Sequence, residues 1–538
     1  MPTHSNGPAY TQRIRKAAVG LMAVCLLVAS SAATLRAQQA ANSEAPKNAA
    51  SQTEKHISAE EAKKLFALVD ELMKFASDDT GLEVRSSVKR QLCTREDVEK
   101  FMRVRLAEDK SAQRMERDEI VLKKFGYLDR DFNLKPFLLD LLKEQVAGYY
   151  DEKTRTVNLL DWLGVELQKP VMAHELTHAL QDQRVNISKW SEQTLQDESS
   201  SSASDTEHLR RDEWDTAREA VAEGQATAVM TDYILKPMGK SVVGDPEVVE
   251  MMRQQMTGTG DDSPVMARAP LLLTESMLFR YRDGLSFEQD VWMDQGKQAA
   301  FGGMLDSPPT SSWEVLNPRE YEHHRMPPVP LLPDIHPLVD TLYRPYDIGQ
   351  IGQLDLRILI QLLGGEPAAR RLAPAWNGGI YWAGQLKSAQ SAAERASTAS
   401  LAYFYLSVWR NASTAAAFAH LYGENLDRKY QGVKAEPLVE KDGEERQVFA
   451  TSEGLVMITQ RGSAVMIAES FPRATAAALT ARVLDAQATG APQMAMAERP
   501  GERLQPLPTL SGDLVRVFAH CGVLKAVVQA ANTLQPAH

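Results

Sequence analysis

The chain has 538 residues, of which 43% are hydrophobic and 24% charged, and this ordinary globular composition excludes a fibrous or wholly disordered protein. Its length predicts two or three structural units. The formal net charge of −11 argues against a nucleic-acid-binding protein, because phosphate contacts require clustered Lys and Arg.

Residues 1–37 have the layout of a secretory signal peptide. Arg13, Arg15 and Lys16 precede an apolar run at 17–29, and small residues follow it. An uncleaved membrane anchor is the alternative, although the strongly apolar part is shorter than the roughly 20 residues that a span requires. Cleavage at the end of this segment removes four basic residues and no acidic ones, which takes the net charge from −11 to −15. We expect an exported protein, periplasmic or extracellular, with no stable membrane span in the mature chain.

The next two segments differ in pattern. Residues 38–57 are polar and poor in aromatic side chains, which predicts a disordered linker. From Ser58 a serine cap, early acidic residues and apolar residues at helical spacing predict helix. We interpret residues 58–140 as an N-terminal helical region that is the first part of the folded protein. An inhibitory propeptide is the alternative.

Two short strands are predicted next, at 146–150 and 155–160, joined by a polar turn. Pro170 is expected to open the following helix, since proline is favoured at the first helical position. After a serine-rich loop, Asp205 is the predicted N-cap of a long helix that ends near residue 235.

The C-terminal half is expected to be mainly helical. The proline-rich stretch 306–347 predicts an extended, wrapping segment. Residues 351–488 are interpreted as a helical region with a C-terminal β-hairpin at 450–471, which turns at Arg461-Gly462, followed by a helix. Residues 489–538 are expected to be a loose tail with a terminal helix near 511–533. These patterns together predict a mainly α fold with a small β component, that is, an α+β protein with a short antiparallel sheet.

The string HELTH carries the clearest chemistry. His174 and His178 lie four residues apart, so on a helix both imidazoles point to one side. Glu175 lies about 100° round the helix, which keeps its carboxylate beside a shared metal ion and within reach of a metal-bound water. This spacing supplies two zinc ligands and a general base. A histidine pair buried only for packing is disfavoured, because such polar groups in an apolar helix are costly unless paired or metal-bound.

A third protein ligand is needed, since a catalytic zinc usually has three of them and a water. The later string REAVAEGQATAVM contains Glu219 and Glu223, which lie four apart among small apolar residues. Gly224 lowers helix stability, which makes sense where the backbone of this helix must come close to another group. An exposed acidic helix face is the alternative, and the apolar flanks argue against it.

The combination of HELTH with a glutamate on a following helix resembles the gluzincin zinc metallopeptidases. The string Ala222-Glu223-Gly224 matches the aminopeptidase and bacterial collagenase branches, where the glutamate is the third ligand. On the pattern of the thermolysin branch, Glu219 would bind the metal and Glu223 would support a histidine. We favour Glu223.

A closer resemblance is to a group of uncharacterised secreted bacterial gluzincin-like proteins. It rests on HELTHALQDQ, on the later EGxAT string and on the stretch 308–321. In that group a histidine occupies the position of Asn317 in this chain. The residue that would donate a hydrogen bond to the oxyanion formed during peptide hydrolysis is therefore not assigned by the resemblance. The candidates for that donor are Tyr281, Tyr321, His323 and His324.

The resemblance implies a secreted zinc-dependent peptidase whose catalytic core is residues 141–350. One catalytic Zn²⁺ would be held by His174, His178 and Glu223, with Glu175 as the base. The partner would be a peptide or protein substrate, not a nucleic acid, and a strand among residues 146–160 would pair with it. A catalytically inactive exported binding or scaffold protein of gluzincin type is the alternative.

Two minor points stay open in the sequence. Cys93 and Cys521, which both remain after signal cleavage, either pair or stay as free thiols. Asp182 lies four residues after His178 and is either a partner of that histidine or an exposed helix acid.

Overall fold

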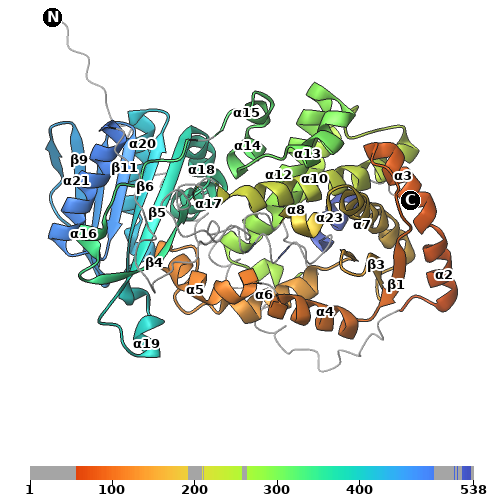
Figure 1. Ribbon diagram of the computed structural model, residues 1–538, viewed down its shortest axis with the longest axis horizontal. Coiled ribbons are helices and arrows are strands. Elements are labelled where there is room, and N and C mark those ends of the chain that lie inside the picture. The colour runs from red at the N-terminus through yellow and green to blue at the C-terminus, as the bar shows by residue number, and fades with distance from the viewer. Residues whose placement is uncertain are drawn as a thin grey trace, which may run out of the picture. The chain divides into compact units, whose positions relative to one another are not determined.

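The structure is a computed structural model (Figure 1). It describes residues 56–108, 110–191, 209, 211–256, 263–326, 328–489, 514, 518 and 524–534. These residues belong to one compact unit, His56–His538. About 58% of the structure is helical and 17% is strand, which confirms the α+β class. The predicted signal peptide and most of the predicted linker lie outside the described residues, and Ile57, at the end of that linker, donates its N–H to the carbonyl of Asp161.

The first part of the unit is helical, as its sequence pattern predicts. Ser58 caps the first helix through a reciprocal pair of hydrogen bonds with Glu61. The helices are α2 (Ala59–Ala67), α3 (Val69–Thr80), α4 (Arg95–Glu108), α5 (Lys110–Phe125) and α6 (Leu134–Gln145). One strand, β1 (Lys89–Cys93), lies among them and was not predicted. Only its last residue is buried, so its sequence carries no apolar alternation, and its strand form comes from pairing with a distant partner.

A small three-stranded sheet forms where the two strands were predicted. Its order is β1–β3–β2, in which β2 (Tyr149–Asp151) is antiparallel and β1 is parallel to the central β3 (Thr156–Leu160). The turn between β2 and β3 places Arg155 at φ 53°. Every residue of β3 is buried, and β2 forms one edge of the sheet.

Helix α7 (Val165–Val185) carries HELTH, and its start differs from the prediction. The helix begins at Val165, so Pro170 lies inside it and does not open it. The side chain of Gln168 explains the earlier start, because it hydrogen-bonds both the N–H and the carbonyl of Leu160 and fastens the first turn to β3. A short helix, α8 (Ile187–Ser191), follows.

The next long helix is α10 (Trp214–Leu235), which has Glu213 at its N-cap. The predicted cap, Asp205, lies outside the described residues. α10 packs along α12 (Leu271–Gln295), and the two ribbons run next to each other in Figure 1. Between and after them lie shorter elements: η2 (Lys236–Met238), α11 (Pro246–Gln255), η3 (Met266–Arg268), the π-helical η4 (Ala299–Gly303) and α13 (Met304–Asp306).

The proline-rich stretch 306–347 is not wholly extended, contrary to the prediction. It contains three short helices, because Ser311 caps one and prolines stand in the first turn of the other two. The elements are α14 (Ser312–Leu316), α15 (Pro318–Glu322) and α16 (His336–Val339), followed by β4 (Tyr343–Gln350).

A second, eight-stranded antiparallel sheet is larger than the predicted hairpin. Its order is β4–β5–β6–β11–β10–β9–β7, with β8 also paired to β9. The hairpin of β10 and β11 turns at Gly462 (φ 57°), as predicted. The strands are β5 (Trp376–Leu386), β6 (Leu401–Trp409), β7 (Lys434–Ala435), β8 (Val439–Lys441), β9 (Glu444–Thr451), β10 (Gly454–Arg461) and β11 (Ala464–Glu469).

The prediction of a helical region between residue 351 and the hairpin at 450–471 was wrong at β5 and β6. Both strands are buried along nearly their whole length, because helices cover both faces of the sheet. Such strands lack the polar–apolar alternation of a half-exposed strand and resemble a buried helix in sequence. The covering and connecting helices are α17 (Gln353–Gly364), α18 (Glu366–Leu372), η5 (Ala373–Ala375), α19 (Ala392–Arg395), η6 (Thr398–Ser400), α20 (Ala412–Glu424), η7 (Leu426–Arg428) and α21 (Arg473–Thr489).

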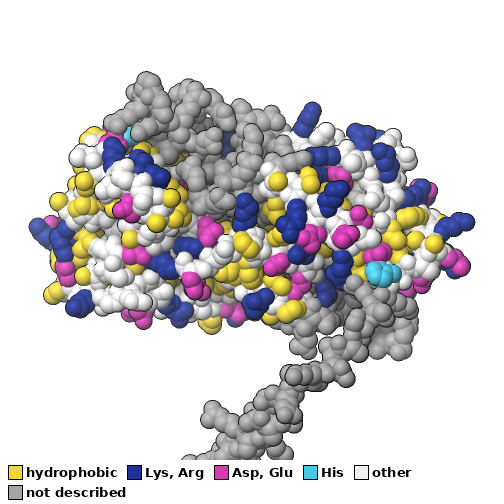
Figure 2. Space-filling model, turned by 90° about the horizontal axis from the view of Figure 1, so that it is seen from below, with side chains coloured by type: hydrophobic (Ala, Val, Ile, Leu, Met, Phe, Trp, Pro, Cys, Tyr) yellow, Lys and Arg dark blue, Asp and Glu magenta, His cyan; other side chains and the backbone are white. Residues whose placement is uncertain are grey.

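The chain returns to the first part of the unit at its C-terminal end. α23 (Lys525–Asn532) packs against α6, α7, α10 and α11. The terminal helix predicted near 511–533 is not continuous, because Leu524 is extended and forms a bridge with Val146, although Leu514 and Phe518 before it are helical. Among the described helices, none combines the length and apolar composition that a bilayer-crossing segment needs. On the face shown in Figure 2, Lys and Arg side chains are interspersed with Asp and Glu.

Candidate metal centre

The candidate site is built on buried turns of helix α7. Every residue of α7 from Pro170 to Gln181 is buried, and His174 and Glu175 are fully inaccessible. The helix lies against α3 on one side and α10 on another, and it also contacts β2 and β3. Two histidines and an acid therefore face protein, where a polar side chain is stable only with a partner.

Three of the predicted site residues come together at the contact of α7 and α10. His174 Nε2 lies 3.0 Å from Glu223 Oε2, and His178 Nε2 lies 3.1 Å from His174 Nε2 and 3.4 Å from the same carboxylate oxygen. Among the described residues, these three form the one group of His, Cys, Asp or Glu side chains arranged to hold a metal ion. Glu219, one turn earlier on α10, is not part of it.

The glutamine after the motif sets the orientation of His178. Gln181 Nε2 donates to the carbonyl of Ala222 (3.0 Å) and to Gln225 Oε1 (2.9 Å), so its Oε1 faces His178 Nδ1 at 2.8 Å. Because that oxygen only accepts, His178 carries a proton on Nδ1, and its Nε2 points at His174 and Glu223. Gln225 Nε2 in turn donates to the carbonyls of Ala300 and Phe301 in η4.

A buried arginine stands behind the carboxylate of Glu223. Arg280 of α12 is inaccessible to solvent, and its guanidinium lies 3.4 Å from Glu223 Oε1, the oxygen that faces away from His174. Arg280 also donates to the carbonyl of Phe518 at 2.7 Å. One carboxylate oxygen is thus held by a cation, and the other lies between the two imidazoles.

A close backbone contact between α10 and α12 places Arg280 next to Glu223. A Cβ built on Gly224 would lie 2.5 Å from the carbonyl carbon and oxygen of Gly284, and one on Gly284 would lie 2.4 Å from the carbonyl of Ala220. α10 and α12 therefore cross where neither has a side chain. The close approach predicted from Gly224 is confirmed.

The charges of this cluster shift its pKa values. Burial alone would lower the pKa of His178, but the Glu223 carboxylate, with Glu175 and Gln181, raises it to about 9. Burial alone would raise the pKa of Glu223, but Arg280 and His178 hold it well below its usual range. Without a metal, the cluster is thus an anionic carboxylate with a protonated imidazole.

Glu175 lies beside the cluster and under the start of β2. A Cβ on Gly148 would lie 2.6 Å from Val171 and 4.0 Å from Glu175 Cγ, so the chain entering β2 passes directly over α7 at this residue. Tyr150 of β2 donates to Asp182 at 3.0 Å and ties the edge strand to the same helix.

The structure places Asp182 and Asn317 away from the imidazoles. Asp182 is half-buried and accepts hydrogen bonds from the Tyr150 hydroxyl and the Ile187 N–H, so the partner of His178 is Gln181. Asn317 donates to the Trp313 carbonyl and to Gln353, and its amide ties α14 to α17.

Of the four candidate oxyanion donors, Tyr281 is the one with a ring contact to His174. Its ring centroid is 6.1 Å from that of His174, and the side chain is fully buried. The hydroxyl of Tyr321 donates to the carbonyl of Ser307, and His323 and His324 are exposed. Cys93 is a buried free thiol beside Tyr149, and Cys521 lies outside the described residues.

The three donors fit a zinc ion by chemistry and by spacing. Two imidazole nitrogens and a carboxylate oxygen are common ligands of catalytic zinc. Tetrahedral bonds of about 2.0–2.1 Å require donor atoms roughly 3.3 Å apart, and the three separations here are 3.0, 3.1 and 3.4 Å. The hydrogen bond from His178 Nδ1 to Gln181 is the kind of outer contact that would hold this imidazole in position as a ligand.

No family model, curated protein or solved structure matches this chain. The evidence for a function therefore comes from the side chains of His174, His178 and Glu223 and from the residues around them.

Sequence reasoning missed two residues of this centre, Gln181 and Arg280. The role of Gln181 could have been predicted, because it lies three residues after His178 and therefore on the same helix face. The role of Arg280 could not have been predicted from the sequence, since only the crossing of α10 and α12 brings it close to Glu223.

Proposed function

We propose that this protein is a zinc-dependent peptidase. The observation that carries the proposal is the convergence of His174, His178 and Glu223 on one point, with Glu175 next to it on the same buried helix. A purely structural zinc site has no use for a carboxylate in the place of Glu175, whereas a hydrolase needs a base there.

The roles of the residues follow from their positions. His174, His178 and Glu223 would hold Zn²⁺, which when bound polarises a substrate carbonyl and acidifies water. Glu175 accepts the proton of the attacking water on a carboxylate oxygen and delivers it to the leaving amine nitrogen. Tyr281, beside His174, is the proposed donor to the oxygen that gains negative charge.

An extended peptide is the substrate form that the small sheet favours. β3 has a neighbour on each side, so it has no free edge, whereas β2 is an edge strand. The segment entering β2 passes over Glu175 at Gly148. A peptide that adds to this edge by backbone hydrogen bonds would bring a peptide bond towards the base.

Replacing the base tests the proposal. Purified protein is expected to contain one zinc per chain and to cleave casein or a peptide library, and Glu175→Gln is expected to keep the zinc and lose activity by about a hundredfold or more. The matched control is Glu166→Gln, which changes an exposed acid of the same helix and is expected to keep full activity. A zinc-free protein, or equal activity of Glu175→Gln and the control, would contradict the proposal.

The same assay separates the two glutamates of α10. Glu223→Gln is expected to lose zinc, because it removes a carboxylate oxygen that lies 3.0 Å from His174 Nε2. Glu219→Gln is expected to keep zinc. The reverse result would assign the ligand to Glu219.

An exported metal-containing binding or scaffold protein is the second candidate. The observation that favours it is the burial of His174, Glu175 and Glu223, which closes the centre to a peptide in this conformation. Zinc bound in full amount, with no cleavage of any peptide by either wild type or Glu175→Gln, would support this function.

A further inference from the structure

The C-terminal helix α23 lies against both helices of the candidate metal centre. It packs on α7, which carries His174 and His178, and on α10, which carries Glu223. Five of its eight residues are buried, and Leu524, directly before it, is fully buried. The far end of the chain is therefore part of the wall around the centre.

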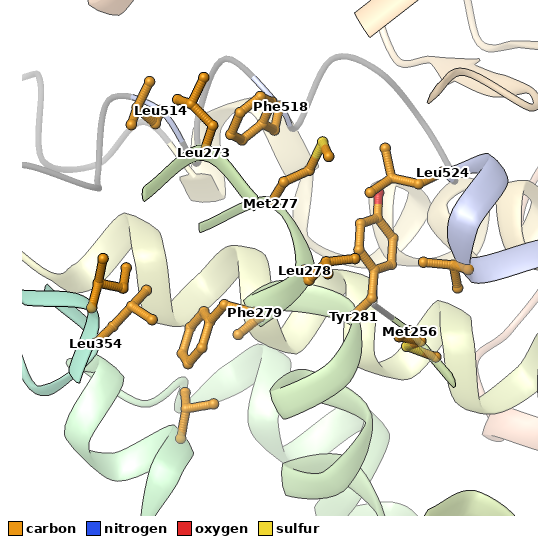
Figure 3. Close-up of a cluster of buried hydrophobic side chains, with 14 of the residues drawn as sticks. Met256, Leu273, Met277, Leu278, Phe279, Tyr281, Leu354, Leu514, Phe518 and Leu524 are labelled. Atoms are coloured by element: carbon orange, nitrogen blue, oxygen red, sulfur yellow. The ribbon is translucent and has the colours of Figure 1, made fainter. Parts of the chain in front are cut away.

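A second contact joins this part of the chain to the ligand set. The carbonyl of Phe518 accepts a hydrogen bond of 2.7 Å from Arg280, and the same guanidinium lies 3.4 Å from Glu223. Figure 3 shows Phe518 beside Leu273 and Met277 of α12, and Leu524 at the hydroxyl end of Tyr281. Tyr281 in turn faces the ring of His174.

The third contact lies beside the strand edge proposed for substrate. Leu524 forms an antiparallel bridge with Val146, which comes shortly before β2 in the chain. The C-terminal segment thus makes the kind of backbone pairing next to Gly148 and Glu175 that an incoming peptide would make.

We propose that this segment, Phe518 together with residues 524–534, is a built-in cover that keeps the centre latent. The inference rests on the proposed function, because it assigns the regulation of the same site. While Leu524 pairs with Val146, a substrate peptide has no access to the edge near Glu175, so the wild type cleaves slowly, through the fraction of molecules in which this pair is open. Activation then requires the segment to move away or to be cut off.

A charge placed at Leu524 tests the cover in the full-length protein. Leu524→Asp puts a carboxylate into an apolar contact and is expected to displace the segment. Gln529→Asp is the matched control, since it adds the same charge at an exposed position of α23. Two quantities are measured for each variant and the wild type: the rate at which the chelator dipicolinate removes zinc, and the rate of peptide cleavage.

The expected result is zinc removal and peptide cleavage that are both about tenfold faster or more in Leu524→Asp, with Gln529→Asp like the wild type. If Leu524→Asp folds and both rates are unchanged, the proposal that this segment covers the centre is overturned. Faster zinc removal with no cleavage by any variant would instead overturn the proposed peptidase. If Leu524→Asp does not fold, as judged by circular dichroism, Leu524→Ala takes its place, because it only removes apolar contacts and is expected to act in the same direction.

Discussion

At the scale of single residues, the centre depends on groups that never touch the metal position. Gln181 forms one hydrogen bond with His178 and two with α10. A single side chain therefore fixes both the orientation of the His178 imidazole and the position of the helix that carries Glu223. Outer contacts of this kind fix the tautomer and direction of a ligand, and their loss weakens metal binding without removing a ligand.

Replacing Gln181 with leucine should therefore lower zinc affinity by about 10- to 100-fold while the three ligands remain. Competition with a fluorescent chelator measures this affinity. Gln183→Leu is the control, because Gln183 lies on the same helix but bonds the backbone of Arg85 and Ser86. Equal zinc affinity in the two variants would show that Gln181 does not position His178.

At the scale of elements, the crossing of α10 and α12 is the critical contact. Gly224 and Gly284 remove the side chains that would separate the two helices, and this brings Arg280 within ion-pair distance of Glu223. The proposed ligand Glu223 and its counter-ion Arg280 thus come from two helices whose spacing is set by backbone contact.

A methyl group at this crossing should push the helices apart. Gly224→Ala is expected to lower the free energy of unfolding by about 1–3 kcal/mol or more, because the new Cβ meets backbone atoms that cannot rotate away. It is also expected to weaken zinc binding as Glu223 moves from α7. Gly302→Ala, whose Cβ would be 3.5 Å from its nearest neighbour, is expected to change stability by about 0.5 kcal/mol or less. Chemical denaturation of both variants measures the difference, and similar losses would contradict this role of the crossing.

The elements also show what can be predicted from sequence and what cannot. The HELTH motif could be interpreted because the spacing of its residues on one helix follows from the sequence alone. The close packing at Gly224 could be predicted because glycine destabilises a helix and therefore indicates a specific packing requirement. β5 and β6 were missed because helices on both faces bury them, which removes the alternation that identifies a strand. Arg280 and the bridge from Val146 to Leu524 were missed because each exists only after distant segments have packed.

At the scale of the whole molecule, a bound zinc ion would compete with protons for the imidazole of His178. The pKa of His178 in the folded, metal-free protein is about 9, against about 6.5 for an unfolded histidine. The folded state therefore retains this proton between the two values. Its contribution to stability is complete below about pH 6.5 and is lost as the pH rises through about 9. A bound zinc must displace this proton, so its affinity follows the opposite trend.

Zinc should accordingly raise the melting temperature more at pH 8 than at pH 6.5. Apparent zinc affinity is expected to increase by about tenfold per pH unit over this window, since one proton leaves for each ion bound. Thermal melts with and without zinc at the two pH values measure the effect, and Glu223→Gln, which lacks the third ligand, should show no zinc-dependent shift at either. An equal shift at both pH values in the wild type would contradict a protonated His178.

The bridge between Val146 and Leu524 has a consequence for the order of folding. Helices α7 and α10 contain all the proposed ligands and leave the ribosome long before residue 524, yet the wall beside them is complete only when Leu524 has paired with Val146. Contacts between positions so far apart form slowly, because a long loop must close before they form. A newly made chain therefore passes through a period in which its ligand helices exist without their cover.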